Sequence, residues 1–266
     1  MHTRTKWLAI GVLTGLLSAT LVACGGATTL APVAAAASVT AEVAVSGSHE
    51  DVTNVDEGGY TTVDQSALSN VLDPIPAGEL SAAEIEGILY MREEEKLARD
   101  VYLTLYERWG LPIFQNIADS EATHMQAVKT LIDRYNLEDP AAGQDVGVFT
   151  NSTLQGLYDQ LVEEGSRSLA SALHVGATIE EIDILDLEER IAQTDRADIQ
   201  MVYENLTKGS RNHLRSFVST LEQQSGEIYQ PQYLSQAAYD AIVAAPMERG
   251  RGGRHGGSQR SAGCCD

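Results

Sequence analysis

Cysteine is scarce in this chain of 266 residues, and none of its three cysteines falls in the central part of the sequence. Cys24 lies near the start, and Cys264 and Cys265 stand together near the end. A disulfide framework is therefore excluded as the basis of the fold.

Basic residues are also few, because 18 Lys and Arg face 38 Asp and Glu and leave a formal net charge of −20 at pH 7. Binding of nucleic acid needs basic patches that neutralise phosphates, so the sequence predicts no nucleic-acid partner. Aromatic residues make up only 6% of the chain, but hydrophobic residues in total make up 43%. That content is sufficient for a good hydrophobic core, and the acidity suits a protein that attracts cations.

A long apolar run is missing too. The run at 8–22, which follows Arg4 and Lys6, is shorter than the roughly 20 residues that span a membrane. It ends in Leu21-Val22-Ala23-Cys24 and resembles a bacterial lipoprotein signal with its lipobox. The resemblance implies that 1–23 is a signal peptide, that Cys24 is lipidated, and that the exported protein is anchored to the membrane at the cell envelope. The alternative is an ordinary signal peptide in which Cys24 is incidental.

The remainder of the chain divides by composition into three parts. Residues 24–80 are rich in Ala, Gly, Ser, Thr and Val, which predicts a disordered tether. Residues 225–266 end in a Gly/Arg-rich stretch and are expected to be a mostly disordered tail. Between them, residues 81–224 carry apolar side chains at helical spacing and form the predicted domain.

The spacing within this domain predicts an all-α fold of four long helices. We expect them from Ser81 to Gly110 and over 114–135, 168–193 and 195–221, with no stretch that alternates with period two. A shorter helix, capped by Asn151 or Ser152 and ending near Gly165, lies in the long connection between the second and third long helices.

Polar residues interrupt the apolar stripe of each long helix near its middle. The interruptions are the carboxylates Glu95, Glu121 and Glu180 and the histidines His124 and His213. A buried carboxylate costs several kcal/mol unless it is paired or bound to a metal. The pattern therefore predicts a metal centre inside the bundle, and its oxygen and nitrogen ligands favour iron, manganese or zinc.

Two of these segments resemble known metalloproteins. Residues 95–102 are similar to the Glu-x-x-Ala-Arg-x-x-Tyr pattern in the first helix of rubrerythrins, and residues 121–124 to the Glu-x-x-His of ferritin-like proteins. The wider sequence resembles an uncharacterised ferritin-like family, domain of unknown function 2202, through residues 91–102, 175–187 and 209–214. The resemblance covers about 81–224 and implies a ferritin-like four-helix bundle with a long crossover and a di-metal centre, but no reaction.

The sequence departs from the ferritin pattern in the fourth helix. Ser210 stands three residues before His213, where the pattern has a glutamate. Asp183, three residues after Glu180, could supply the missing carboxylate, and Glu181 is a rival for Glu180 because one residue of helix phase is uncertain. Either the centre is asymmetric or only one metal position is well occupied.

Each of these residues also has an interpretation that requires no metal. Each histidine alone would more often be a satisfied core residue than a ligand, and Tyr102 is interpreted first as core packing. Six further glutamates are expected on solvated faces: Glu93, Glu94, Glu163, Glu164, Glu188 and Glu189.

Three functions fit this sequence. The first is an envelope-anchored di-iron or di-manganese carboxylate oxidoreductase acting on peroxide or dioxygen. Because the chain has no Cys-x-x-Cys pair, its electrons would come from a redox partner protein. The alternatives are a non-catalytic metal-binding or sequestering lipoprotein, for instance with zinc, and a metal-free structural bundle. A homodimer stays an open alternative.

Overall fold

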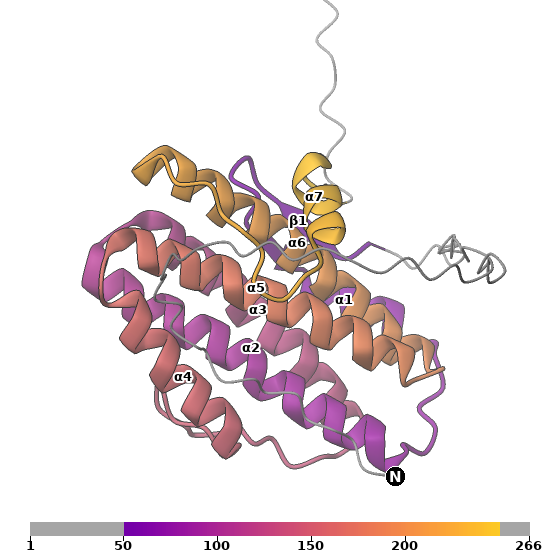
Figure 1. Cartoon of the computed structure of the whole chain (residues 1–266). Helices are drawn as coiled ribbons and strands as arrows, with labels where there is room; N and C mark the ends of the chain where they lie inside the picture. The colour runs from indigo at the N-terminus through magenta and orange to yellow at the C-terminus, as the bar shows by residue number, and fades with distance from the viewer. Residues whose placement is uncertain (1–50, 251–266) are drawn as a thin grey trace, which may run out of the picture. The chain divides into compact units, whose positions relative to one another are not determined.

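The structure is a computed structural model that describes residues 51–250 (Figure 1). The expected signal peptide, the lipidation site Cys24 and the Cys264–Cys265 pair lie outside the described residues. Within 51–250, no helix has both the length and the apolar character needed to cross a membrane.

Helices dominate the described residues, which confirms the all-α prediction, and the small sheet is an addition to it. The elements are β1 Thr53–Val55, β2 Thr61–Val63, α1 Gln65–Leu72, α2 Ala82–Trp109, α3 Pro112–Arg134, α4 Ser152–Gly165, α5 Leu169–Ala192, α6 Ala197–Ser225 and α7 Gln236–Ala244. The long helices begin and end within a few residues of their expected limits. Ser81 and Glu84 form the expected capping box of α2, and Asn151 caps α4.

The four long helices form a bundle (Figure 1). Helix α2 lies against α3 and α5, and α6 lies against α5 and α3. The connection from α3 to α5 therefore crosses the diagonal of the bundle, and α4 within it packs on α2 and α5. This is the predicted long crossover with its short extra helix.

Two apolar clusters fill the bundle, one toward each end. The first contains Leu105, Phe114, Leu173 and Phe217, and the second contains residues from the other half of each long helix, such as Leu131. From the order of the clusters along each helix, α2 and α6 run from the second cluster to the first, and α3 and α5 run the opposite way.

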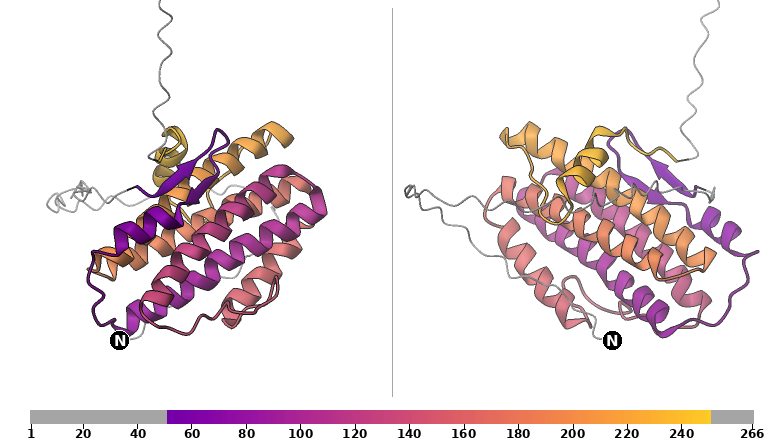
Figure 2. Two further views of the ribbon diagram at one scale, coloured as in Figure 1. Left: turned by 180° about the vertical axis from the view of Figure 1, so that it is seen from behind. Right: turned by 45° about the vertical axis from the view of Figure 1, so that its right-hand side comes forward.

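The expected disordered tether was wrong for its last part, 51–80. The hairpin β1–β2 lies beside α6 and α3 (Figure 2), and helix α1 begins at its N-cap Asp64. Val63, Leu68 and Leu72 are buried in the second cluster. Composition missed this segment because a few well-placed apolar residues are enough to dock it, and strands of three residues are too short to show alternation.

The expected disordered tail was wrong for 226–250. Helix α7 forms there, and Tyr229 and Tyr239 are buried in the first cluster. Glu248 pairs with Arg211 and Arg215 of α6. These anchors are contacts with distant parts of the chain, which helical periodicity does not reveal.

Candidate metal centre

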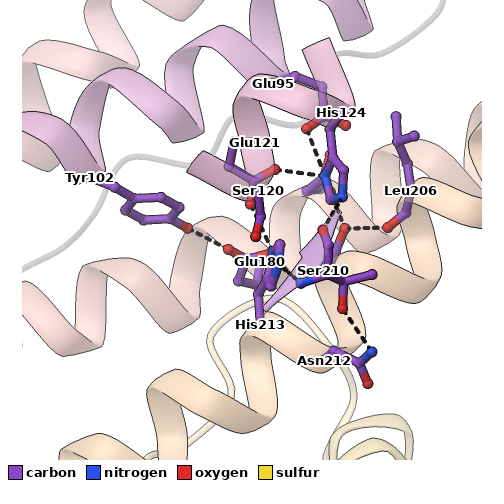
Figure 3. Close-up of polar contacts among 12 residues, drawn as sticks. Glu95, Tyr102, Ser120, Glu121, His124, Glu180, Leu206, Ser210, Asn212 and His213 are labelled. Carbon is purple, nitrogen blue, oxygen red and sulfur yellow. Dashed lines mark hydrogen bonds and ion pairs between the residues drawn. The ribbon is translucent and has the colours of Figure 1, made fainter. Parts of the chain in front are cut away.

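A polar layer separates the two apolar clusters, and each long helix of the bundle contributes to it (Figure 3). Its five residues are at most 2% exposed. They are Glu95 of α2, Glu121 and His124 of α3, Glu180 of α5, and His213 of α6. The structure thus brings together the predicted interruptions of the four apolar stripes.

Glu121 lies between the two histidines. Its Oε2 is 2.7 Å from His124 Nδ1, and its Oε1 is 2.8 Å from His213 Nδ1. The two imidazole rings are stacked, with centroids 5.4 Å apart and planes inclined by 20°. Ligand atoms of the three residues lie within 4.8 Å of one another, which is close enough to bind one metal ion together.

Two more carboxylates flank this triad in matching positions. Glu95 Oε2 is 3.5 Å from His124 Nδ1, and Glu180 Oε2 is 3.7 Å from His213 Nδ1. Each histidine therefore faces the shared Glu121 and one carboxylate of its own.

Several atoms of the layer are buried without a directed hydrogen bond. Among the described residues, these include both carboxylate oxygens of Glu95, Nδ1 of His124, Nδ1 of His213 and Oδ1 of Asp183. An unsatisfied buried polar atom costs about 1–3 kcal/mol, so such atoms are rare in proteins unless an ion or water satisfies them. Their convergence in one place, together with their oxygen and nitrogen chemistry, fits a cation such as iron, manganese or zinc.

Burial and mutual charge set the pKa values of the layer. Burial, which the nearby His124 only partly offsets, raises the pKa of Glu95 to about 8. Burial opposes ionisation of Glu121 too, but the two histidines hold its pKa well below the usual range. Burial disfavours the charged form of His213, yet Glu121 and Glu180 raise its pKa to about 9. The layer thus favours positive charge at its centre.

Asp183 lies beside Ser210, the residue that stands where the ferritin pattern has a glutamate. It is 5% exposed, and the hydroxyl of Ser210 is hydrogen-bonded to its Oδ2. Burial, and then the charges of Glu95, Glu121 and Glu180, raise the pKa of Asp183 well above the usual range. A carboxylate of α5 therefore lies beside the serine that replaces the expected glutamate of α6.

Glu181, the rival for Glu180, faces away from the centre. Its carboxylate accepts hydrogen bonds from the backbone N–H groups of Gln232, Tyr233 and Leu234. Successive residues of a helix differ by about 100° in direction, so only one of the two glutamates can face the layer. Glu181 instead holds the segment before α7.

Tyr102 and Gly209 support the layer. The Tyr102 hydroxyl donates a hydrogen bond of 2.6 Å to Glu180 Oε1, so this tyrosine does more than fill the core. Gly209 leaves room for a histidine, because a Cβ atom there would lie 2.5 Å from Cε1 of His124.

Two glutamates expected on solvated faces are buried instead. Glu93 and Glu94 are both 3% exposed. Glu93 accepts hydrogen bonds from the N–H groups of Thr150 and Asn151 and so anchors the crossover. Burial and the charge of Asp186 raise the pKa of Glu94 well above its usual range.

Sequence reasoning missed one residue of the centre, Thr61 of β2. Its N–H group lies 3.2 Å from His213 Nε2, and its carbonyl oxygen lies 3.0 Å from His124 Nε2. These contacts use the main chain, so no choice of side chain could have pointed to them.

Comparisons with known proteins find a family, a relative and a solved structure that are similar to the helical part of this chain. The family model of an uncharacterized protein domain, DUF2202, matches residues 84–246. The uncharacterized protein MJ0754 of Methanocaldococcus jannaschii is 54% identical over 179 residues, which cover 67% of this chain and 96% of that protein. The crystal structure of the hypothetical protein MJ0754 from Methanococcus jannaschii superimposes with a TM-score of 0.64 at 54% identity, over 65% of this chain and 99% of that one. The range 84–246 contains the five side chains of the layer and Asp183, but not β1, β2 or α1.

Proposed function

This chain belongs to the DUF2202 family, and on that premise we propose that it is a metal-binding oxidoreductase of the di-iron or di-manganese carboxylate type. The observation that carries the proposal is the position of Glu121 between two buried histidines, 2.7 and 2.8 Å from their Nδ1 atoms. A carboxylate in that place can be shared by two metal ions, one on each side.

The donor set supports two positions. Glu95 and His124 lie on one side of Glu121, and Glu180 and His213 lie on the other. We assign Asp183, whose Oδ2 accepts a hydrogen bond from Ser210 of α6, to the second group. Four carboxylates and two histidines match the composition of carboxylate-bridged di-iron and di-manganese bundles, although one carboxylate comes from α5 instead of α6. We include in this proposal that the bundle is related to ferritin-like proteins.

Bound iron or manganese would supply the electrons for reducing a small substrate such as peroxide or dioxygen. The protein side chains hold the ions, and the two apolar clusters keep bulk water from the layer. Because the five residues of the layer are at most 2% exposed, a large substrate cannot reach the ions without rearrangement. A small oxidant fits this burial best.

Elemental analysis of the purified full chain tests metal binding directly. We expect about two iron or manganese ions per chain, and a fall of at least tenfold in affinity for Glu121→Gln and for His124→Ala, since both remove a ligand. His174→Ala is the matched control, because His174 is partly exposed and pairs with Glu227 outside the layer. No bound metal after incubation with iron, manganese and zinc would refute metal binding and leave the structural bundle.

Peroxide consumption by the iron-loaded chain separates catalysis from sequestration. We expect turnover with a chemical reductant present, because the chain carries no Cys-x-x-Cys pair of its own and needs an external electron donor. Full iron loading without turnover would support the second candidate, a metal-binding or sequestering protein. One tightly bound zinc ion would favour a structural site.

Anchoring at the cell envelope is a separate part of the proposal. It rests on the Leu21-Val22-Ala23-Cys24 sequence. Fractionation of cells that express the full chain should place the protein with membranes, and Cys24→Ser should release it, because the lipid is attached to this thiol. Equal distribution of the two forms would contradict the anchor.

A further inference from the structure

Glu94 of α2 is a buried carboxylate outside the polar layer that the fold itself does not explain. It is 3% exposed, and neither of its carboxylate oxygens has a hydrogen-bond partner among the described residues. Burial of an unpaired carboxylate is costly. Glu93 and Glu181 offset this cost because they accept hydrogen bonds from main-chain N–H groups and hold segments in place. Glu94 holds no segment, so its burial calls for another partner.

The packing of α2 against α5 places two aspartates next to Glu94. The hydroxyl of Tyr90 donates to Asp186 Oδ2 at 3.2 Å, so these two residues lie opposite each other on the two helices. Because α2 and α5 run in opposite directions, one turn forward on α2, at Glu94, lies beside one turn back on α5, at Asp183. The pKa of Glu94 is raised by burial and then by the charges of Asp186 and Asp183, which agrees with this register.

The three carboxylates form a series from the surface to the metal centre. Asp186 is partly exposed, Glu94 is buried, and Asp183 is buried beside Ser210 of α6. Oδ1 of Asp183, like both oxygens of Glu94, has no hydrogen-bond partner in the described part of the chain. The polar layer itself is closed to solvent, so an ion that binds there has to cross the bundle. Unpaired oxygens follow one another along one such path.

No basic side chain within 51–250 forms an ion pair with Glu94 or Asp186. The nearby Arg190 is bound instead to Glu86, through hydrogen bonds of 2.7 and 3.0 Å. Carboxylate oxygens are ligands that hard divalent cations prefer, so a cation from solution can take the vacant role. The described groups of three ligand residues close enough to share one ion do not include Glu94 or Asp186. An ion at this pair is therefore held by two carboxylates and its own waters, weakly enough to move on.

We propose that Glu94 and Asp186 form an entry site for divalent cations, from which an ion passes to Asp183 and the metal centre. The inference rests on the proposed metal centre and deepens it by assigning the route by which the centre is loaded. Glu94 and Asp186 bind the entering ion and are not ligands of the ions in the centre. They therefore set the rate of loading, and they leave the final affinity of the centre nearly unchanged.

The rate of Co²⁺ uptake by the metal-free full chain tests the route. Uptake is followed by the change in visible absorption as Co²⁺ exchanges water for the ligands of the centre. We expect Glu94→Gln to slow uptake about tenfold or more and Asp186→Asn to slow it several-fold, because each removes a charge that attracts and holds the entering ion. The amount of Co²⁺ bound at equilibrium should equal that of the parent protein. Unchanged rates in both variants would overturn the inference.

Two control variants separate this route from a general effect of charge. Glu93→Gln makes the same change at the neighbouring residue, which is equally buried but faces the crossover. Asp119→Asn removes a carboxylate from the polar groove of about 400 Å³ beside the hairpin, the rival path to the centre. Both should leave the rate within about twofold of the parent protein. A slowing in either control equal to that in Glu94→Gln would overturn the inference.

Anomalous diffraction from crystals of the full chain in millimolar Mn²⁺ tests the entry site independently of the centre. We expect a peak between the carboxylates of Glu94 and Asp186, in the parent protein and in Glu121→Gln, and no peak there in Glu94→Gln. An ion at the pair with an empty centre would refute the proposed function and support the entry site.

An empty pair would overturn the inference whatever the centre holds, because two neighbouring carboxylates can share a proton instead of an ion. If the parent protein takes up no Co²⁺ at its centre, or if Glu94→Gln does not fold, the Mn²⁺ peak in the parent crystal decides.

Discussion

The polar layer and the two apolar clusters are built on the same four helices and follow the same spacing, yet they affect the protein in opposite ways. The clusters bury residues such as Leu131 and Phe217, which are 0% exposed, and each such side chain contributes about 1.5–3 kcal/mol by leaving water. The layer buries carboxylates and imidazoles of equally low exposure, for which leaving water is costly.

The polar layer therefore does not stabilise the fold of the metal-free protein. Burial raises the pKa values of Glu95, Glu180 and Asp183, and several of its atoms have no hydrogen-bond partner within the described part of the chain. A metal ion would turn this unfavourable arrangement into a favourable one, and substitutions in the two regions should therefore respond differently to metal.

The largest expected effect is a loss of stability caused by a substitution in one of the apolar clusters. Leu131→Ala should lower the free energy of unfolding by about 2–5 kcal/mol, because it leaves a cavity in a packed core. Urea unfolding with and without metal measures the effect. The gain in stability on adding metal should equal that of the parent protein, and a large loss of this gain would show that the two regions are not independent.

The second effect is a pH dependence of the metal-free protein. The pKa of Glu95 rises from 4.5 to about 8 on folding, and that of His213 from 6.5 to about 9. The folded state therefore holds protons that the unfolded state has released, and stability should fall by a few kcal/mol as the pH rises from about 5 to 9. Unfolding in urea across this range measures the slope.

Metal should reverse this trend, since it competes with the same protons. Saturating Mn²⁺ should stabilise the protein more at pH 8 than at pH 6. Glu121, whose pKa is lowered, contributes in the opposite sense, and its stabilisation is lost only as the pH falls below about 4.5. A metal-free protein that gains stability between pH 5 and 9 would contradict the charge arrangement described for the layer.

A smaller effect, on metal affinity, is expected from a substitution of Asp183. Asp183→Asn should weaken the second metal ion about tenfold, or 1.4 kcal/mol, and leave the first nearly unchanged. Calorimetric titration separates the two steps. Asp186→Asn, one turn further along α5, is the matched control. Loss of both ions in Asp183→Asn would show that this carboxylate is shared by the two positions.

The smallest effect is expected at Tyr102. Tyr102→Phe removes the hydrogen bond to Glu180 Oε1 and should cost about 0.5–1.5 kcal/mol in stability. Metal affinity should change only a few-fold, because Tyr102 contacts a candidate ligand and is not one itself. Thermal unfolding and metal titration measure the two changes, and a loss of metal binding would assign Tyr102 a direct role.

Much of the bundle could be predicted from the sequence, because helical spacing is a local property. Ser81, Asn151 and Gly110 mark helix ends by their side chains or their lack of one. The interruption of apolar stripes by Glu95, Glu121 and His124 was equally visible, since each is named by its distance from neighbours on its own helix.

The errors have a common cause. Glu93 lies two residues before Glu95 on α2, and Glu181 lies one residue after Glu180 on α5, so neither points into the bundle. Whether they are buried depends on which segments cover the other faces of these helices. The covering segments, the crossover and the chain before α7, are far away in the sequence. Periodicity along one helix contains no information about them.

The sequence by itself determined that Glu95, Glu121, His124 and His213 lie on the inward stripes of their helices, because helix geometry converts spacing into direction; that they bind a metal stays a prediction. Only the tertiary structure decided that Asp183 lies where a glutamate was expected, and that Thr61 contacts both histidines. Both facts depend on distances between segments remote in the chain. The second also uses main-chain groups that every residue but proline shares, which is why no sequence pattern could contain it.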